Sequence, residues 1–125
     1  MEPLHFEAQT DSPEVYLDNE KKIFRIEGNS FADDPVPYYL PIFDWLEKYK
    51  KDPNPETVFV FKLNYINTAS TKQVANVLMK LEELKDLTNV KVKWYYQEDD
   101  EDMFDEGNSL KTMINLDFDF IEHND

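Results

Sequence analysis

Residues 57–84 constrain the fold more than any other part of the chain, because an apolar strand pattern runs directly into a helical one. Residues 57–61, Thr-Val-Phe-Val-Phe, are apolar on both faces, which is typical of a central strand covered from both sides. Apolar side chains then recur at helical spacing, at Val74, Val77, Leu78, Leu81 and Leu84. A strand followed at once by an amphipathic helix predicts a parallel crossover, and therefore a sheet with helices packed on it.

Shorter patterns extend this unit in both directions. A helix is expected to begin at Asp33-Asp34-Pro35, with a carboxylate cap and Pro35 at its first position, and to be irregular near Pro41. Another helix is expected over residues 103–113, weakened at Gly107. The remaining patterns predict strands at 4–8, 14–18, 22–27, 90–96 and 116–121, with a hairpin turn through 18–20. Together they predict one small α/β domain over residues 1–125, with a mixed β-sheet and helices packed on it.

The composition excludes several classes of function. The 125 residues include 27 acidic and 13 basic side chains, for a formal net charge of −14, and Arg25 is the single arginine. Such a charge opposes binding to nucleic acid, whose phosphates need a basic face. Without Cys the chain can form no disulfide, thiolate metal site or cysteine nucleophile. The two glycines, Gly28 and Gly107, are too far apart to build a phosphate-binding loop.

Catalysis and membrane binding also lack support in the sequence. No recognisable set of catalytic residues appears, so we expect a protein that is not an enzyme and that needs no cofactor. The first residues lack a basic and apolar leader, and no stretch approaches the ~20 apolar residues of a membrane span. We therefore expect a soluble, cytoplasmic protein with no membrane or nucleic-acid partner.

Residues 67–71, Asn-Thr-Ala-Ser-Thr, form the first candidate site, at the junction between the expected central strand and its helix. A helix N-terminus exposes unpaired backbone N–H groups and carries a partial positive charge. A hydroxyl side chain at this position either caps the helix or accepts a phosphate group, whose charge the helix end would stabilise. The spacing alone leaves both interpretations open.

The second candidate site is a run of five carboxylates: Glu98, Asp99, Asp100, Glu101 and Asp102. Such a run can complement the dipole at the start of a helix, dock a basic partner, or hold Mg²⁺ or Ca²⁺. The calcium-loop pattern fails, because no glycine stands at the required sixth position. The alternative function for the chain is thus an acidic metal-binding domain or a small metal-dependent enzyme that uses Glu98 to Asp102.

Several segments, in order along nearly the whole chain, resemble the SiaC family of regulatory phosphoproteins: residues 1–4, 10–15, 34–36, 44–46, 64–72, 94–96 and 98–103. The resemblance implies a STAS-like fold, the architecture of anti-sigma-factor antagonists, which agrees with the expected order of elements. It also implies a role in bacterial partner switching. In this family a kinase phosphorylates a threonine, a PP2C-type phosphatase removes the phosphate, and the unphosphorylated protein binds and activates a diguanylate cyclase.

The family motif also implies which residue accepts the phosphate. The match places the acceptor at Thr68, beside Asn67. Members of the family often have Ser after this threonine, whereas this chain has Ala69, so Ser70 and Thr71 are the remaining alternative acceptors. The partners implied are a SiaB-like protein kinase, a SiaA-like phosphatase of the PP2C type and, as output protein, a SiaD-like diguanylate cyclase.

Overall fold

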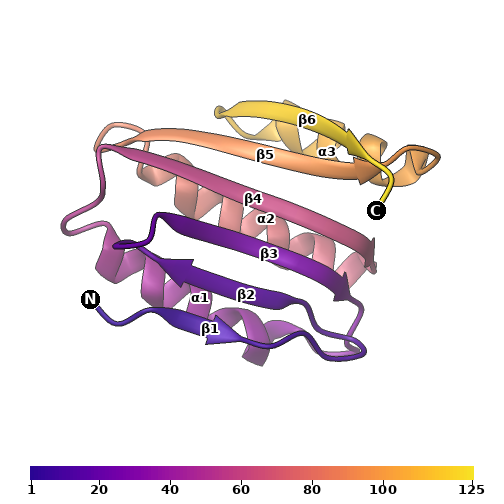
Figure 1. The fold of residues 1–125 in the computed structure, drawn as a ribbon, viewed down its shortest axis with the longest axis horizontal. Helices are drawn as coiled ribbons and strands as arrows, with labels where there is room; N and C mark the ends of the chain where they lie inside the picture. The colour runs from indigo at the N-terminus through magenta and orange to yellow at the C-terminus, as the bar shows by residue number, and fades with distance from the viewer.

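In the computed structural model, which describes residues 1–125, six strands lie side by side in the order in which they occur in the chain (Figure 1). The elements are β1 (Leu4–Phe6), β2 (Glu14–Asp18), β3 (Ile23–Ser30), α1 (Val36–Tyr49), β4 (Glu56–Ile66), α2 (Thr68–Glu83), β5 (Asn89–Gln97), α3 (Glu101–Met113) and β6 (Asp117–His123). The strands β1, β2 and β3 pair antiparallel, and β3 to β6 pair parallel. The predicted mixed sheet is confirmed. None of the three helices is both long and apolar enough to cross a lipid bilayer.

The three helices cover one face of the sheet only (Figure 1). Each helix connects two parallel strands, and a buried cluster of 24 apolar side chains fills the space between the helices and the sheet. Along β4, Phe59 and Phe61 are fully buried against the helices, whereas Val58 and Val60 are only half-buried. The expectation that this strand is covered from both sides is therefore wrong. The hydrophobic pattern of the sequence identifies the apolar side chains of the strand, but it does not show which face of the sheet a helix covers.

Helix α1 differs from the expectation in two ways. It begins at Val36, so Pro35 is the residue before the helix, and the Asp34 carboxylate accepts a hydrogen bond from the Val36 N–H at 3.3 Å. It also continues through Pro41 without a break. Proline removes one N–H donor from the helix, which here leaves the carbonyl of Pro37 without its usual partner. Burial of the apolar face of α1, including Tyr39, outweighs that local cost.

Helix α3 is continuous through Gly107, where the sequence predicts a weak point. A Cβ atom at this position would lie 2.4 Å from Nε1 of Trp94, a buried side chain of β5. The glycine thus lets the backbone of α3 approach the indole ring closely. The same indole donates a hydrogen bond from Nε1 to the Met103 carbonyl at 3.0 Å, which fixes α3 to the sheet.

Strand β3 extends further than expected, to Ser30 instead of residue 27. Gly28 and the two residues after it have the composition of a turn, but here they continue the strand past an irregularity. Gly28 has a φ of 122°, and the register between β3 and β4 shifts between Gly28 and Asn29. As a result Ser30 reaches the start of α2.

Candidate functional site

The candidate site lies at the edge of the sheet where the parallel strands β3, β4 and β5 end. Each of these strands is followed by a helix, so the N-termini of α1, α2 and α3 all lie at this edge (Figure 1). In parallel sheets this edge collects the loops between strands and helices, together with unpaired N–H groups of the helix ends. Both sites suggested by the sequence, residues 67–71 and 98–102, fall here.

Asn67 fixes the start of α2 to the end of β3. Its Oδ1 accepts a hydrogen bond from the Ser70 N–H at 2.8 Å, which makes it the N-cap of the helix. Its Nδ2 donates to the Ala32 carbonyl at 3.2 Å, and its backbone N–H donates to the Ser30 carbonyl at 3.1 Å. The junction between strand and helix is therefore held by both the side chain and the backbone of one residue.

Thr68 is the first residue of α2, and its side chain is exposed. The interpretation that Thr68 caps the helix is wrong, because the capping hydrogen bond comes from Asn67. The neighbouring Ala69 is exposed as well and adds no bulk beside the hydroxyl. Thr68 thus presents a hydroxyl group to the outside at the positive end of the helix.

Ser70 and Thr71, the two alternative hydroxyls, have different surroundings. Ser70 is fully buried, and its Oγ accepts a hydrogen bond from Ser30 Oγ at 2.8 Å. Ser30 Oγ in turn lies 2.8 Å from the hydroxyl of Tyr39 on α1, where burial raises the Tyr39 pKa to about 12. Thr71 is half-buried, and its Oγ1 lies 3.0 Å from Glu106 Oε1 on α3. Of the three hydroxyls only that of Thr68 is exposed.

The acidic run begins α3. Asp100 is the N-cap residue, and its Oδ1 accepts a hydrogen bond from the Met103 N–H at 3.0 Å. Glu101 and Asp102 lie in the first turn, where carboxylates complement the helix dipole. The remaining two carboxylates, Glu98 and Asp99, stand in the turn between β5 and α3. No three acidic or histidine side chains of the molecule lie close enough to hold a metal ion, so the geometry does not support the metal-binding alternative.

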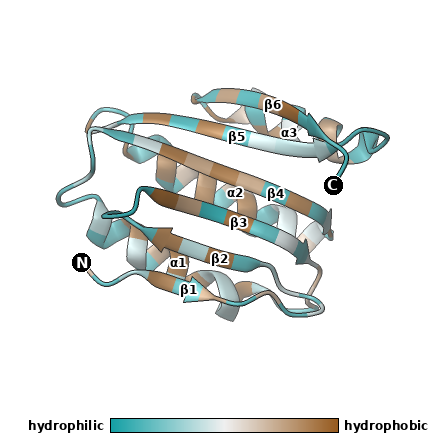
Figure 2. Cartoon of the chain, in the orientation of Figure 1, coloured by the Kyte–Doolittle hydropathy of each residue, from teal (hydrophilic) through white to brown (hydrophobic).

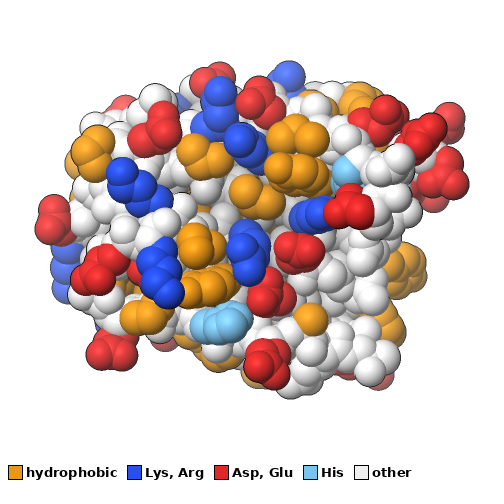
Figure 3. Space-filling model, viewed as in Figure 1, with side chains coloured by type: hydrophobic (Ala, Val, Ile, Leu, Met, Phe, Trp, Pro, Cys, Tyr) orange, Lys and Arg blue, Asp and Glu red, His pale blue; other side chains and the backbone are white.

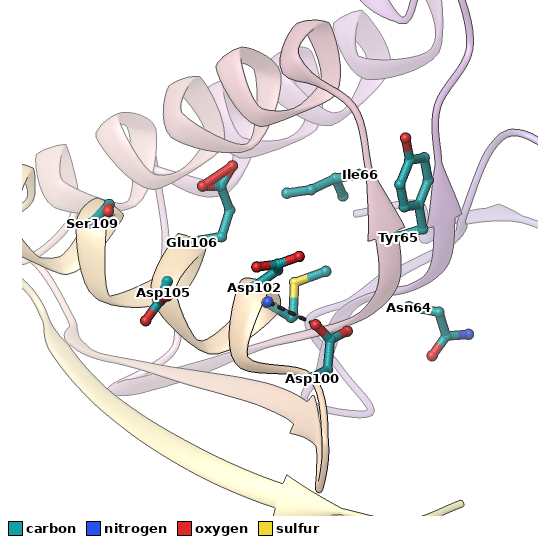
Figure 4. A pocket seen from close by; sticks show the side chains of 9 residues that line it. Asn64, Tyr65, Ile66, Asp100, Asp102, Asp105, Glu106 and Ser109 are labelled. Carbon is teal, nitrogen blue, oxygen red and sulfur yellow. Dashed lines mark hydrogen bonds between the residues drawn. The ribbon is translucent and has the colours of Figure 1, made fainter.

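A hollow of about 430 Å³ separates the end of β4 from α3. Four carboxylates of α3 and its cap line one wall: Asp100, Asp102, Asp105 and Glu106. Figure 4 shows Asp102 and Glu106 pointing from α3 into the gap beside β4 and α2. The hollow adjoins the first turn of α2 through the contact between Glu106 and Thr71. Its charge suits a basic side chain of a partner.

An exposed aromatic pair on the same edge was not singled out as a contact surface by the sequence. Tyr65, near the end of β4, is 57% exposed, and Phe31, after β3, is 36% exposed. Their rings meet edge to face, with centroids 5.7 Å apart. The sequence gives only weak indications that these two rings are exposed. Tyr65 follows the polar Asn64 where the strand leaves the core, and Phe31 follows a segment that resembles a turn. Exposed aromatic rings are enriched at the centres of protein interfaces.

Comparisons with known proteins agree with this architecture. The model of the SiaC family of regulatory phosphoproteins matches residues 6–123. An uncharacterized protein of Pseudomonas aeruginosa strain UCBPP-PA14 is 25% identical over 97 residues, which cover 77% of each chain. The fold is similar to apo-SiaC from Pseudomonas aeruginosa, with a TM-score of 0.86 and 21% identity over 97% of this chain and 99% of that one. It is also similar to a chain in the crystal structure of the diguanylate cyclase SiaD in complex with its activator SiaC, with a TM-score of 0.88 and 21% identity over 96% and 99% of the two chains.

Proposed function

The chain belongs to the SiaC family of regulatory phosphoproteins, and we propose that it is a non-enzymatic switch whose binding to partner proteins is controlled by phosphorylation of Thr68. One observation carries the choice of residue. Among the hydroxyls at the start of α2, Thr68 is exposed, Ser70 is fully buried, and Thr71 is half-buried against Glu106. A kinase transfers phosphate only to an oxygen that enters the kinase active site. A fully buried hydroxyl cannot enter it while the substrate protein stays folded.

A phosphate on Thr68 changes the surface and leaves the fold in place. The group adds about −1.5 to −2 charges at the positive end of α2, where negative charge is stabilising. The capping bond from Asn67 to the Ser70 N–H does not involve the Thr68 hydroxyl and is retained. The effect therefore falls on whatever protein contacts this edge.

The loss of binding has a direct electrostatic cause. A partner that packs over the exposed start of α2 must remove water from the charged phosphate or place groups beside it that do not complement its charge. Either unfavourable contact costs roughly 2–5 kcal/mol of binding free energy, which is a 30-fold to several-thousand-fold loss of affinity. The unphosphorylated protein is thus the form that binds.

The output partner that we propose is a diguanylate cyclase, which the unphosphorylated protein binds and activates. The similarity in fold to SiaC bound to SiaD supports this choice. A SiaB-like kinase and a SiaA-like phosphatase of the PP2C type would add and remove the phosphate. The cyclase would contact the edge that carries Thr68, with the aromatic pair Phe31 and Tyr65 beside it and the acidic hollow receiving a basic side chain.

A pull-down from the native cells tests the switch. The wild type and Thr68→Ala are expected to retain a diguanylate cyclase, and Thr68→Asp is expected to lose it. Thr112→Asp is the matched control, because Thr112 is also an exposed threonine but lies at the far end of α3. Retention of the cyclase by Thr68→Asp, or its loss from the Thr112→Asp control to the same degree, would contradict the proposal.

A further inference from the structure

The face of the sheet opposite the helices has no part of the chain over it (Figures 1 and 3). Its side chains are those that alternate with the core positions of each strand. We call the outward side chains of β3, β4 and β5 the open sheet face. Its central side chains are Ile23, Arg25, Val58, Val60, Lys91 and Lys93. All six are half-buried by their neighbours in the sheet.

The middle of the open sheet face is apolar and has cations on both sides. Val60 of β4 pairs with Arg25 of β3 on one side and with Lys93 of β5 on the other, and Val58 pairs with Lys91. Figure 3 shows apolar side chains grouped in the centre of this face among lysine and arginine side chains. A sheet face that meets only water usually carries polar side chains at such positions, so two outward valines on the central strand point to a partner.

The three central strands of this face carry more cations than carboxylates, and the flanking strands add the carboxylates Glu14 on β2 and Asp117 and Asp119 on β6. The outward positions of β3, β4 and β5 carry four cations, which include Lys62, and two carboxylates, Glu27 and Glu56, in a chain of net charge −14. Three of the cations contact carboxylates located towards the sides of the face: Arg25 with Glu14 at 3.0 Å, Lys62 with Asp125 at 2.8 Å and Lys91 with Asp119 at 3.5 Å. Lys93, beside Val60, forms no ion pair, because Asp119, its neighbour on β6, contacts Lys91 instead.

A second copy of the chain does not suit this face. If two copies stacked face to face about an axis along β4, Arg25 of one copy would lie opposite Lys93 of the other. If the axis ran across the strands, the β5 strands would lie over each other and Lys91 and Lys93 would meet the same two lysines. Either arrangement brings like charges together at the centre of the contact, which costs free energy.

We propose that the open sheet face docks an acidic segment of a partner protein, in which carboxylates stand beside apolar side chains. The apolar side chains would pack on Val58 and Val60, and the carboxylates would reach Lys93 and the neighbouring cations. This surface lies on the layer opposite the helices, away from the exposed start of α2. A partner here is therefore able to bind whether or not Thr68 is modified, and the proposal does not depend on the switch.

An NMR titration of the full-length, ¹⁵N-labelled protein tests this surface. The probe is the capped octapeptide Glu-Val-Glu-Val-Glu-Val-Glu-Val at low salt, and the control peptide has Lys in place of each Glu. We expect saturable shifts of amides in β3, β4 and β5 with the acidic peptide and none with the basic one. Amide shifts confined to the helices, stronger binding of the basic peptide, or no saturable shift at all would overturn the proposal.

A matched pair of charge reversals separates this face from general electrostatics. Lys93→Glu replaces one attraction with one repulsion and is expected to weaken binding of the acidic peptide about tenfold. Lys85→Glu makes the same change in net charge at an exposed lysine in the turn after α2, outside the strands of the open sheet face, and is expected to change the affinity less than about twofold. Equal losses in both variants would show that the peptide responds to net charge alone and would overturn the proposed surface.

Discussion

Asn67 and Thr68 are neighbours, but only Asn67 makes the hydrogen bond that caps α2. Asn67 makes the capping hydrogen bond of α2, whereas the Thr68 side chain points outward. Asn67→Ala should therefore lower the free energy of unfolding by about 1 kcal/mol, and Thr68→Ala should change it by less than about 0.5 kcal/mol. Urea denaturation of the two variants measures both values. A loss for Thr68→Ala as large as that for Asn67→Ala would mean that Thr68 has a structural function after all.

Tyr39 makes the stability of the protein depend on alkaline pH. Burial raises its pKa from 10.0 to about 12 in spite of the hydrogen bond with Ser30. The unfolded chain then ionises this tyrosine first, so stability is complete below pH 10 and falls as the pH rises from 10 towards 12. The loss due to Tyr39 at pH 11 should be about 1.4 kcal/mol. Denaturation curves at pH 8 and pH 11 should show this extra loss in the wild type relative to Tyr39→Phe, and equal losses in both would contradict it.

Gly107 offers a test of close packing between α3 and the sheet. Alanine is the better helix former by about 1 kcal/mol, but its Cβ would lie 2.4 Å from Trp94 Nε1. We expect Gly107→Ala to destabilise the protein by about 1–3 kcal/mol, because α3 must move away from the indole. Asn108→Ala, at the exposed next position, should be neutral or slightly stabilising in the same thermal unfolding assay. Stabilisation by both substitutions would exclude the close contact.

The two faces of the sheet should respond differently to the same substitution. Val92 of β5 is fully buried against the helices, whereas Val60 of β4 lies on the open sheet face. Val92→Ala should cost about 2–3 kcal/mol, because it leaves a cavity in the core, and Val60→Ala less than about 1 kcal/mol. Chemical denaturation of the two variants measures the difference. Equal costs would mean that another part of the protein covers the valine at position 60.

The strands and helices were predictable because their periodicities are local. Strand β2 was predicted with the correct ends, and the apolar stripe from Val74 to Leu84 correctly indicated α2. The errors have tertiary causes: Pro41 is tolerated by the packing of α1, and Gly107 is required by the indole ring of Trp94. The absence of a helix over Val58 and Val60 is likewise a property of the whole arrangement, which a pattern along one strand does not contain.

The candidate site was predictable in part. The polar junction before α2 marked residues 67–71, and the family resemblance selected Thr68 among them. The buried Ser70 hydroxyl is hydrogen-bonded to Ser30, 40 positions away in the chain, which in turn contacts Tyr39, and only the fold brings these residues together. The side chains that line the acidic hollow come from β4 and α3 and could not be grouped from their spacing.

The hydrophobic core and the proposed phosphorylation site lie in different parts of the molecule. The hydrophobic cluster lies between the sheet and the helices, and Thr68 lies at the edge, outside that cluster. Figure 2 shows the hydrophobic residues concentrated in the central strands, while the loops at the sheet edges are mainly hydrophilic. A phosphate on Thr68 should therefore leave amide hydrogen exchange in β4 and in most of α2 unchanged, with differences limited to about residues 67–71. Faster exchange across the sheet after phosphorylation would contradict a switch that acts only at the surface.

The proposed switch acts on Thr68, and mass spectrometry of the intact protein from its native cells can detect the phosphate that it requires. The protein should occur in two forms that differ by one phosphate, and mapping of the peptide that spans residues 67–72 should place that phosphate on Thr68. A protein that is never phosphorylated, or a phosphate on Ser70 or Thr71 in place of Thr68, would show that the switch does not act on Thr68.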